Sequence, residues 1–526
     1  MNDLLIRGGT VIDGTGAPRS IADVLIHRGH IVRVGDASAE PALRTIEAAG
    51  QVVAPGFIDI HAHSDEAMFL NDALESALHM GVTLVVNGNC GGSSAPVYGC
   101  AASDLDRDLS RSNLVRSWAT FAEYADAVER ARPAINVCSF VGHGTLRSSV
   151  MGPVARAPSG KELAAMRELL RQALLEGAVG LSSGLIYPPS AFADAAELAS
   201  LCAEVRSLDR LYASHIRNEG AGLLEAVEEN LEIGRRSGVR VQLSHHKAAG
   251  EGNWGLVERS TALIERARAQ GQDVAADQYP YTASSTGLSV VIPNWVHEGG
   301  PSAMCLRLAD PVILGRIATE ETETGRAWER IVIARARQRP DWAGRSVADL
   351  AGAAGKDPLS WVAEALILHE GAVDIIHHSM DEGDVRLVMA KPWVCIGSDS
   401  RANAPYGPLS FGKPHPRSYG TFPRVLGRYV REVGLFSLEE AVRKMTTLPA
   451  SRLHLEGRGV VRAGAWADLV IFDPDLIGDV ATYDDPHRYP TGTLQVIVNG
   501  AVVLDGGETV AGVRPGRFLR LGLAAA

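Results

Sequence analysis

The sequence predicts an α/β protein: a (β/α)8 TIM-type barrel with a small β-sandwich built from both chain ends and an inserted lobe. Three observations support this fold class. The middle of the chain alternates short β-type runs with helical stretches, which is typical of parallel strands joined by crossover helices. Both ends consist of short β-type runs and turns instead. A long stretch after Asp277 interrupts the alternation.

The composition is that of a globular protein with a sizeable core. The chain has 526 residues, of which 46% are hydrophobic and 21% charged. A net charge of −11 argues against a nucleic-acid or anionic-membrane partner. The start resembles no signal peptide, and no apolar run reaches the roughly 18 residues of a membrane span. The 6 cysteines form no CxxC pair, so we expect a reduced, cytoplasmic protein.

The two chain ends share a β-rich texture. Residues 1–50 and 458–512 both alternate β-type runs with turns, and Asn499-Gly500 is a strong hairpin signal. Such strands cannot bury a face unaided, so the ends are expected to form one small sheet or sandwich. We assign its two parts to residues 1–55 and 452–526.

The central region, residues 56–451, is assigned to the barrel. Helical patterns such as 160–177 and 222–238 separate nine strand-like segments: 57–63, 82–90, 135–144, 178–185, 210–215, 239–246, 273–279, 373–378 and 393–399. Eight repeats close a barrel, so one segment is surplus. We choose 373–378, because metal-type residues end the others. The insertion spans about 285–370, since this stretch is too long for an ordinary loop.

The run VVAPGFIDIHAHSD ends in His61 and His63. Residues i and i+2 of a strand point the same way, so this H-x-H pair aims two imidazoles at one place. That geometry suits a metal ion.

Other metal-competent side chains end further strands. In a (β/α)8 barrel the active site lies at these carboxyl ends. The further candidates are Cys90, His215, His245 and Asp399. Taken singly, the cysteine fits a small buried residue, each histidine a satisfied polar group and the aspartate a helix cap. Taken together they favour a metal centre.

These segments resemble a known family. The motifs GGTVIDGTG, PGFIDIHAHSD, NGNCG, SHIRNE, SHHK, DQYPYTASST, GSDS, HPRSYGTFPR and GxxADLVIFDP are similar to those of the amidohydrolase superfamily and, within it, the D-aminoacylases (N-acyl-D-amino-acid deacylases). Most superfamily members bridge two metals with a carboxylated lysine or a glutamate. NGNCG resembles the D-aminoacylase variant, in which a cysteine takes that role.

The resemblance implies a zinc-dependent hydrolase of N-acyl-D-amino acids. Cys90, His215 and His245 would hold one tight zinc, and three protein ligands leave a place for water. A second, adjacent site, weak or partly occupied, would use His61, His63 and Asp399. The implied partner is a small N-acyl amino acid, and a homo-oligomer stays possible.

The expected chemistry is attack by a metal-activated water on the amide carbonyl. Asp399 is the candidate general base that takes the water's proton and then passes it to the departing amine. The alternative is that Asp399 is only a metal ligand.

Three groups match the family's positions for the substrate's α-carboxylate: Lys247, a tyrosine of DQYPYT, and Arg417. A guanidinium offers two prongs to a carboxylate, a lysine a point charge and a tyrosine a donor. Tyr279 is slightly preferred over Tyr281, because spacing alone does not separate them. Structural ion pairs are the alternative for Lys247 and Arg417.

The chain departs from the family pattern after GSD. Its segment SDSRANAPYGPLSFGKPHPR is longer and less acidic than expected, and it carries Arg401, Tyr406 and Lys413 near the predicted mouth. His143 and Tyr187 also lie at strand ends, where either could line the pocket, although we expect local structural roles. His246 is expected to point away from the site.

Two other functions stay open. A dihydroorotase- or hydantoinase-like cyclic-amide hydrolase would use the same barrel, although the fourth strand, GAVGLSSGLIYPPS, carries no lysine. A catalytically inactive metal-binding homologue is the second.

Overall fold

The computed structural model describes residues 1–324 and 326–522. Two parallel sheets form a barrel wall, with the orders β6-β7-β8 and β17-β13-β12-β11-β10-β9. β8 and β9 are consecutive pieces of one strand, interrupted at Phe140, and a parallel bridge between Ala62 and Ser400 links the first and last strands. The strands are β6 (Phe57–Asp59), β7 (Val82–Asn87), β8 (Asn136–Ser139), β9 (Val141–Gly142), β10 (Gly180–Gly184), β11 (Leu211–His215), β12 (Arg240–Leu243), β13 (Val274–Gln278) and β17 (Val394–Ile396).

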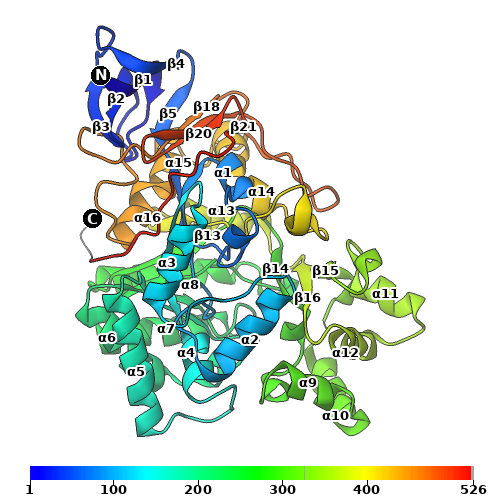
Figure 1. The fold of residues 1–526 in the computed structure, drawn as a ribbon. Helices are drawn as coiled ribbons and strands as arrows, with labels where there is room; N and C mark the ends of the chain where they lie inside the picture. Colours follow the sequence, from blue (N-terminus) through cyan, green and yellow to red (C-terminus); the bar gives the residue numbers. More distant parts are fainter. Residues whose placement is uncertain (325, 523–526) are drawn as a thin grey trace.

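Helices cover the barrel and connect its strands (Figure 1). Their sequences carry start signals: Ser159 and Glu162 form a capping box at the start of α5, which satisfies two otherwise free backbone donors. The helices are α1 (Glu75–His79), α2 (Gly99–Ser110), α3 (Phe121–Ala131), α4 (His143–Val150), α5 (Gly160–Leu175), α6 (Ala195–Ser207), α7 (Leu223–Ser237), α8 (Leu256–Ala269), α13 (Glu382–Ala390), α14 (Arg417–Arg424), α15 (Leu438–Met445) and α16 (Thr447–Arg452).

Both chain ends enter one sheet, as the sequence predicts. β5 pairs antiparallel with β18 and so joins the N-terminal strands to the C-terminal ones. The strands are β1 (Asn2–Val11), β2 (Ser20–His27), β3 (His30–Gly35), β4 (Ala42–Glu47), β5 (Val52–Pro55), β18 (Leu469–Phe472), β19 (Thr493–Val498), β20 (Ala501–Asp505) and β21 (Glu508–Thr509).

The last described residues leave this sheet and return to the barrel. The Leu519 amide donates to Val137, and the Leu521 amide donates to Gly177. Residues 523–526 of the predicted segment 452–526 lie outside the described residues.

A lobe is inserted between β13 and α13, and Figure 1 shows it projecting from a different side than the sheet of chain ends. Its own apolar core is separate from that of the barrel. Its elements are β14 (Ser284–Gly287), α9 (Pro301–Leu308), α10 (Pro311–Thr324), β15 (Ile331–Ala336), α11 (Val347–Ala353), α12 (Pro358–Leu368) and β16 (Val373–His377). Residue 325 is outside the description.

The surplus strand lies in this lobe. β16 pairs antiparallel with both β14 and β15 and takes no part in the barrel wall. The prediction that 373–378 is not a barrel strand is therefore confirmed. Among the described residues, no helix has both the length and the apolar character needed to cross a membrane.

Candidate metal centre

The predicted ligands gather at the carboxyl ends of the barrel strands, where a barrel active site is expected. In chain order they are His61 and His63 after β6, Cys90 after β7, His215 at the end of β11, His245 after β12 and Asp399 after β17.

Three of these residues adopt a left-handed backbone. The φ angles are 52° at Cys90, 35° at His245 and 50° at Asp399. Such angles are uncommon for residues other than glycine and persist only where the surrounding structure imposes them. Each turn sends its side chain from the end of a strand toward the barrel axis.

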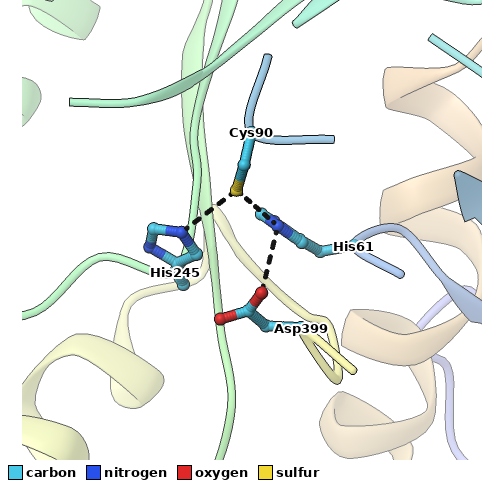
Figure 2. A group of neighbouring side chains, drawn as sticks. All are labelled: His61, Cys90, His245 and Asp399. Carbon is cyan, nitrogen blue, oxygen red and sulfur yellow. Dashed lines mark hydrogen bonds and ion pairs between the residues drawn. The ribbon is translucent and has the colours of Figure 1, made fainter. Parts of the chain in front are cut away.

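Four side chains point toward one another in Figure 2. The Cys90 Sγ atom lies 3.3 Å from His61 Nε2 and 3.5 Å from His245 Nε2. His61 Nε2 is 3.5 Å from Asp399 Oδ1, which also lies 3.1 Å from His63 Nε2. One ligand atom from each of His61, Cys90, His245 and Asp399 falls within 4.8 Å of the others.

His215 lies beside this group, with its ring centroid 4.3 Å from that of His245. Both of its ring nitrogens are buried and have no hydrogen-bond partner within the described chain. A buried imidazole without a partner is costly, and an ion held with Cys90 would supply one. Thiolate and imidazole are ligands that zinc prefers, so these residues fit a zinc site.

Two carboxylates that the sequence analysis missed support the histidines. Asp277 Oδ1 lies 3.0 Å from His61 Nδ1 and accepts a hydrogen bond from the His245 amide. Glu219 Oε1 lies 3.0 Å from His245 Nδ1 and accepts a hydrogen bond from Lys247 Nζ at 2.5 Å.

Both missed residues had a signal in the sequence. Asp277 lies near the end of the segment DVAADQY, and Asp399 ends WVCIGSD. Glu219 follows His215 by four residues in SHIRNE. Their neighbours on other strands, however, are known only from the structure.

The electrostatics favour a thiolate and an ionised aspartate. Burial acts to raise the pKa of the Cys90 thiol, but the nearby His61 and His245 outweigh it and hold that pKa well below its usual value. Burial likewise acts to raise the pKa of Asp399, and Arg417 and His245 overcome it, so that the pKa is well below its usual value.

Three of the four predicted substrate-binding residues come together. The Arg417 guanidinium is 2.9 Å from Asp399 Oδ2 and stacks over the Tyr279 ring, 4.6 Å from its centroid. Lys247 Nζ is 5.7 Å from the same ring centroid. Lys247 and Arg417 are also nearly fully buried.

The structure places Tyr281 elsewhere. Its ring stacks with the Arg424 guanidinium at 4.7 Å and lies 5.1 Å from the His415 ring. A Cβ on Gly420 would come within 2.5 Å of its hydroxyl, so that hydroxyl faces packed backbone. Tyr279 and Tyr281, which spacing could not separate, thus occupy different environments.

His143 and His246 make local contacts, whereas Tyr187 lines the cavity at the site. His143 Nδ1 is 2.9 Å from the Ser190 hydroxyl, and its Nε2 is 2.9 Å from Glu197. His246 Nε2 is 2.8 Å from the Ser260 hydroxyl, away from the metal cluster. The Tyr187 ring packs against His215, and its hydroxyl bonds to Thr286 in the lobe.

A cavity of about 820 Å³ opens from the cluster toward the lobe. His63 and Cys90 line its inner end, and Met304 and Arg335 line the side formed by the lobe. The unusual segment after Asp399 contributes Arg401 to the lining. This segment is anchored by Tyr406, whose hydroxyl donates to Glu75.

A family model described as "Amidohydrolase family" matches residues 44–504. The chain belongs to this family. The amidohydrolase is 42% identical over 520 residues to N-acyl-D-glutamate deacylase from Alcaligenes xylosoxydans xylosoxydans, covering 98% of this chain and 96% of that one. It is 38% identical to D-aminoacylase from the same organism, over 98% and 97% of the two chains.

A solved structure has the same architecture. The crystal structure of N-acyl-D-glutamate deacylase from Bordetella bronchiseptica, complexed with zinc and a phosphonate inhibitor, matches the amidohydrolase with a TM-score of 0.85. The two are 40% identical, and the match covers 99% of each chain. The predicted resemblance to the D-aminoacylases and the predicted barrel fold are confirmed.

Proposed function

We propose that this amidohydrolase hydrolyses the amide bond of N-acyl-D-amino acids and releases a carboxylate and a free D-amino acid. The observation that carries the proposal is the Cys90 thiol among the buried imidazoles and the Asp399 carboxylate at the barrel mouth. The D configuration rests on the names of the similar proteins, which are deacylases of D-amino acids.

We propose that Cys90, His215 and His245 hold one tight zinc ion. His61, His63 and Asp399 then form an adjacent site that is weak or partly occupied. When bound, zinc supplies Lewis-acid chemistry, activating water near neutral pH and polarising the amide carbonyl.

Asp399 is the proposed general base and acid. Its Oδ1 faces His61 and His63, while Oδ2 is held by Arg417, so the carboxylate is fixed at the cluster. It accepts a proton from the attacking water and passes it to the departing amine, because an amine leaves poorly unless it is protonated.

Lys247, Tyr279 and Arg417 are the proposed site for the substrate's α-carboxylate. Their grouping supports this assignment, because two cationic side chains lie against the Tyr279 ring and one of them, Arg417, contacts Asp399. Tyr281 is left out of the proposal because of its packing against Arg424.

The fourth barrel strand argues against a cyclic-amide hydrolase that uses a bridging lysine. β10 has the sequence GLSSG, with no lysine. A Cβ on Gly184 would come within 2.1 Å of the Cys90 carbonyl oxygen, so this strand end has no room for a bridging side chain. The turn that carries Cys90 occupies the space beside this strand end.

A cytoplasmic location is also proposed. It is supported by the six cysteines, which are all free in the described chain.

The test is a substrate panel with metal analysis of the same sample. N-acetyl-D-methionine is compared with its L enantiomer, a hydantoin and dihydroorotate. We expect zinc-dependent hydrolysis of the D compound alone. Turnover of the cyclic amides without the acyl amino acid would overturn the proposal.

Asp399→Asn tests the role of the carboxylate. We expect most of the zinc to be retained and kcat to fall by about 100-fold or more, the usual worth of a general base. The exposed Asp484 provides a matched control, Asp484→Asn. Comparable kcat in Asp399→Asn and the wild type would remove the acid–base assignment.

A further inference from the structure

Besides Asp399, the Glu219 carboxylate touches both the proposed metal site and the proposed substrate site. It lies after β11, four residues beyond His215, and its side chain is 14% exposed. Its Oε2 atom is 3.7 Å from His215 Nε2, and its Oε1 atom contacts His245 and Lys247. Glu219 is neither a proposed metal ligand nor a proposed substrate-binding residue.

The two edges of the His245 ring face different groups. Nε2 lies 3.5 Å from the Cys90 sulfur, whereas Nδ1 lies 3.0 Å from Glu219 Oε1. If an ion shared with Cys90 uses Nε2, Nδ1 carries the hydrogen and donates it to Glu219. A carboxylate behind a ligating imidazole fixes the ring's orientation and tautomer and increases its basicity.

The same oxygen also holds Lys247. Lys247 Nζ donates to Glu219 Oε1 at 2.5 Å and lies 2.8 Å from His245 Nδ1. With the hydrogen on Nδ1, the ammonium and the ring N–H are both donors, and Glu219 Oε1 is the acceptor that they share. Lys247 is nearly fully buried, so its contact with Glu219 fixes where the ammonium lies.

We infer that Glu219 is a positioning residue shared by the two sites: it orients His245 toward the metal ion and holds Lys247 where the substrate's carboxylate binds. Asp277 supports His61 in a similar way but contacts no candidate for substrate binding. The inference rests on the proposed function for its substrate half. Its metal half can be tested without substrate.

The experiment compares Glu219→Gln with the wild type in two assays. Zinc affinity is measured on metal-free protein by competition with a chelator, and kcat and KM are measured with N-acetyl-D-methionine. We expect the zinc Kd to rise by about 10- to 100-fold, the usual effect of removing a carboxylate behind a ligating histidine. We expect KM at saturating zinc to rise by about 10-fold as well, because Lys247 loses the charged acceptor that positions its ammonium.

Three further variants separate this role from a loss of folding. Glu219→Asp keeps the charge and should restore part of both properties. Lys247→Met should raise KM and leave the zinc Kd within about two-fold, since it does not touch the metal-facing edge of His245. Glu228→Gln, at an exposed position on α7, should match the wild type in both assays.

The outcomes distinguish the inference from the proposed function. A wild type that binds zinc but does not hydrolyse the substrate removes the proposed function, while the zinc assay still tests Glu219. Unchanged zinc Kd and KM in Glu219→Gln would overturn the inference. So would binding of one zinc fewer at saturation, which would make Glu219 a direct ligand.

Discussion

At the scale of single residues, the metal cluster depends on unfavourable backbone angles. Cys90, His245 and Asp399 all have positive φ, which costs an L-residue roughly 1–2 kcal/mol. Three of the six predicted ligands therefore have an unfavourable backbone conformation. Positive φ at these positions turns each side chain from its strand end into the cluster, so the strain has a geometric consequence.

Cys90→Gly tests this interpretation. Glycine accepts a positive φ without cost, whereas alanine keeps the strain and removes the same sulfur. We expect both Cys90→Gly and Cys90→Ala to lose tight zinc binding. The metal-free glycine variant should be more stable than the alanine variant by about 1 kcal/mol. Thermal unfolding of the two metal-free proteins measures the difference, and equal midpoints would contradict the argument.

Arg417 connects the proposed base to the proposed substrate site. Its guanidinium pairs with Asp399 and stacks over Tyr279. We therefore expect Arg417→Ala to raise KM sharply for an N-acetyl-D-amino acid and also to lower kcat, because Asp399 loses the cation that fixes it. Steady-state kinetics separates the two effects. An unchanged KM would mean that the α-carboxylate is bound elsewhere.

The sequence was informative about ligands and less so about their partners. His61, His63 and Cys90 could be predicted because each follows an apolar run that reads as a strand, and a barrel brings strand ends together. The roles of Glu219 and Asp277 could not be predicted, since they depend on which imidazole lies next to each carboxylate in the folded protein. For Tyr279 and Tyr281 the deciding factor was packing against other elements, which spacing does not encode.

At the scale of elements, β10 and the turn after β7 are packed against each other at the site. The Gly184 position, at the end of β10, leaves no room for a Cβ beside the Cys90 carbonyl. The close contact between β10 and the Cys90 turn requires glycine at position 184. A side chain at this position would displace the turn that carries the thiol.

Gly184→Ala should therefore act on the metal site through the backbone. We expect a loss of about 1–3 kcal/mol of stability from overpacking and weaker zinc binding, because the Cys90 turn must move. Gly160→Ala is the control, since nothing lies within 4 Å of a Cβ at that position. A Gly184→Ala protein with wild-type zinc affinity would show that the turn tolerates displacement.

The alternation of elements predicted the barrel, and the positions of the metal-type residues predicted which strand is surplus, but neither predicted the internal layout of the lobe. β16 reads as a buried strand, and only its antiparallel pairing with β14 and β15 shows which sheet it joins. The return of residues 517–521 to the barrel was also invisible in the sequence, because it depends on backbone bonds to Val137 and Gly177.

At the scale of the whole molecule, the barrel is joined to the sheet of chain ends through buried polar contacts as well as apolar ones. His79, at the end of α1, stacks on Tyr489 with ring centroids 3.8 Å apart and contacts the Thr509 hydroxyl in β21. Tyr489 also donates to Glu75, the carboxylate that anchors Tyr406 of the mouth segment. The docking of the sheet and the shape of the mouth therefore share one set of contacts.

This junction should make stability depend on pH. Burial lowers the pKa of His79 to about 4, although Glu75 acts in the opposite direction. In the unfolded chain the histidine titrates near 6.5, so both states are neutral above that pH. As the pH falls from about 6.5 to about 4, only the unfolded state takes up the proton. The free energy of unfolding then decreases, by as much as about 3 kcal/mol from this residue.

His79→Phe keeps an aromatic ring against Tyr489 and removes the titration. At pH 7 the variant should be less stable than the wild type, because the contact with Thr509 is lost. As the pH is lowered to 5, the difference in stability should shrink. Only the wild type loses stability in this range, because its histidine takes up a proton only in the unfolded state. Thermal midpoints of metal-free protein at pH 7, 6 and 5 measure the difference without interference from zinc. A constant difference across this range would mean that His79 is not held neutral by the junction, and that the pH sensitivity of the molecule arises in another part of the fold.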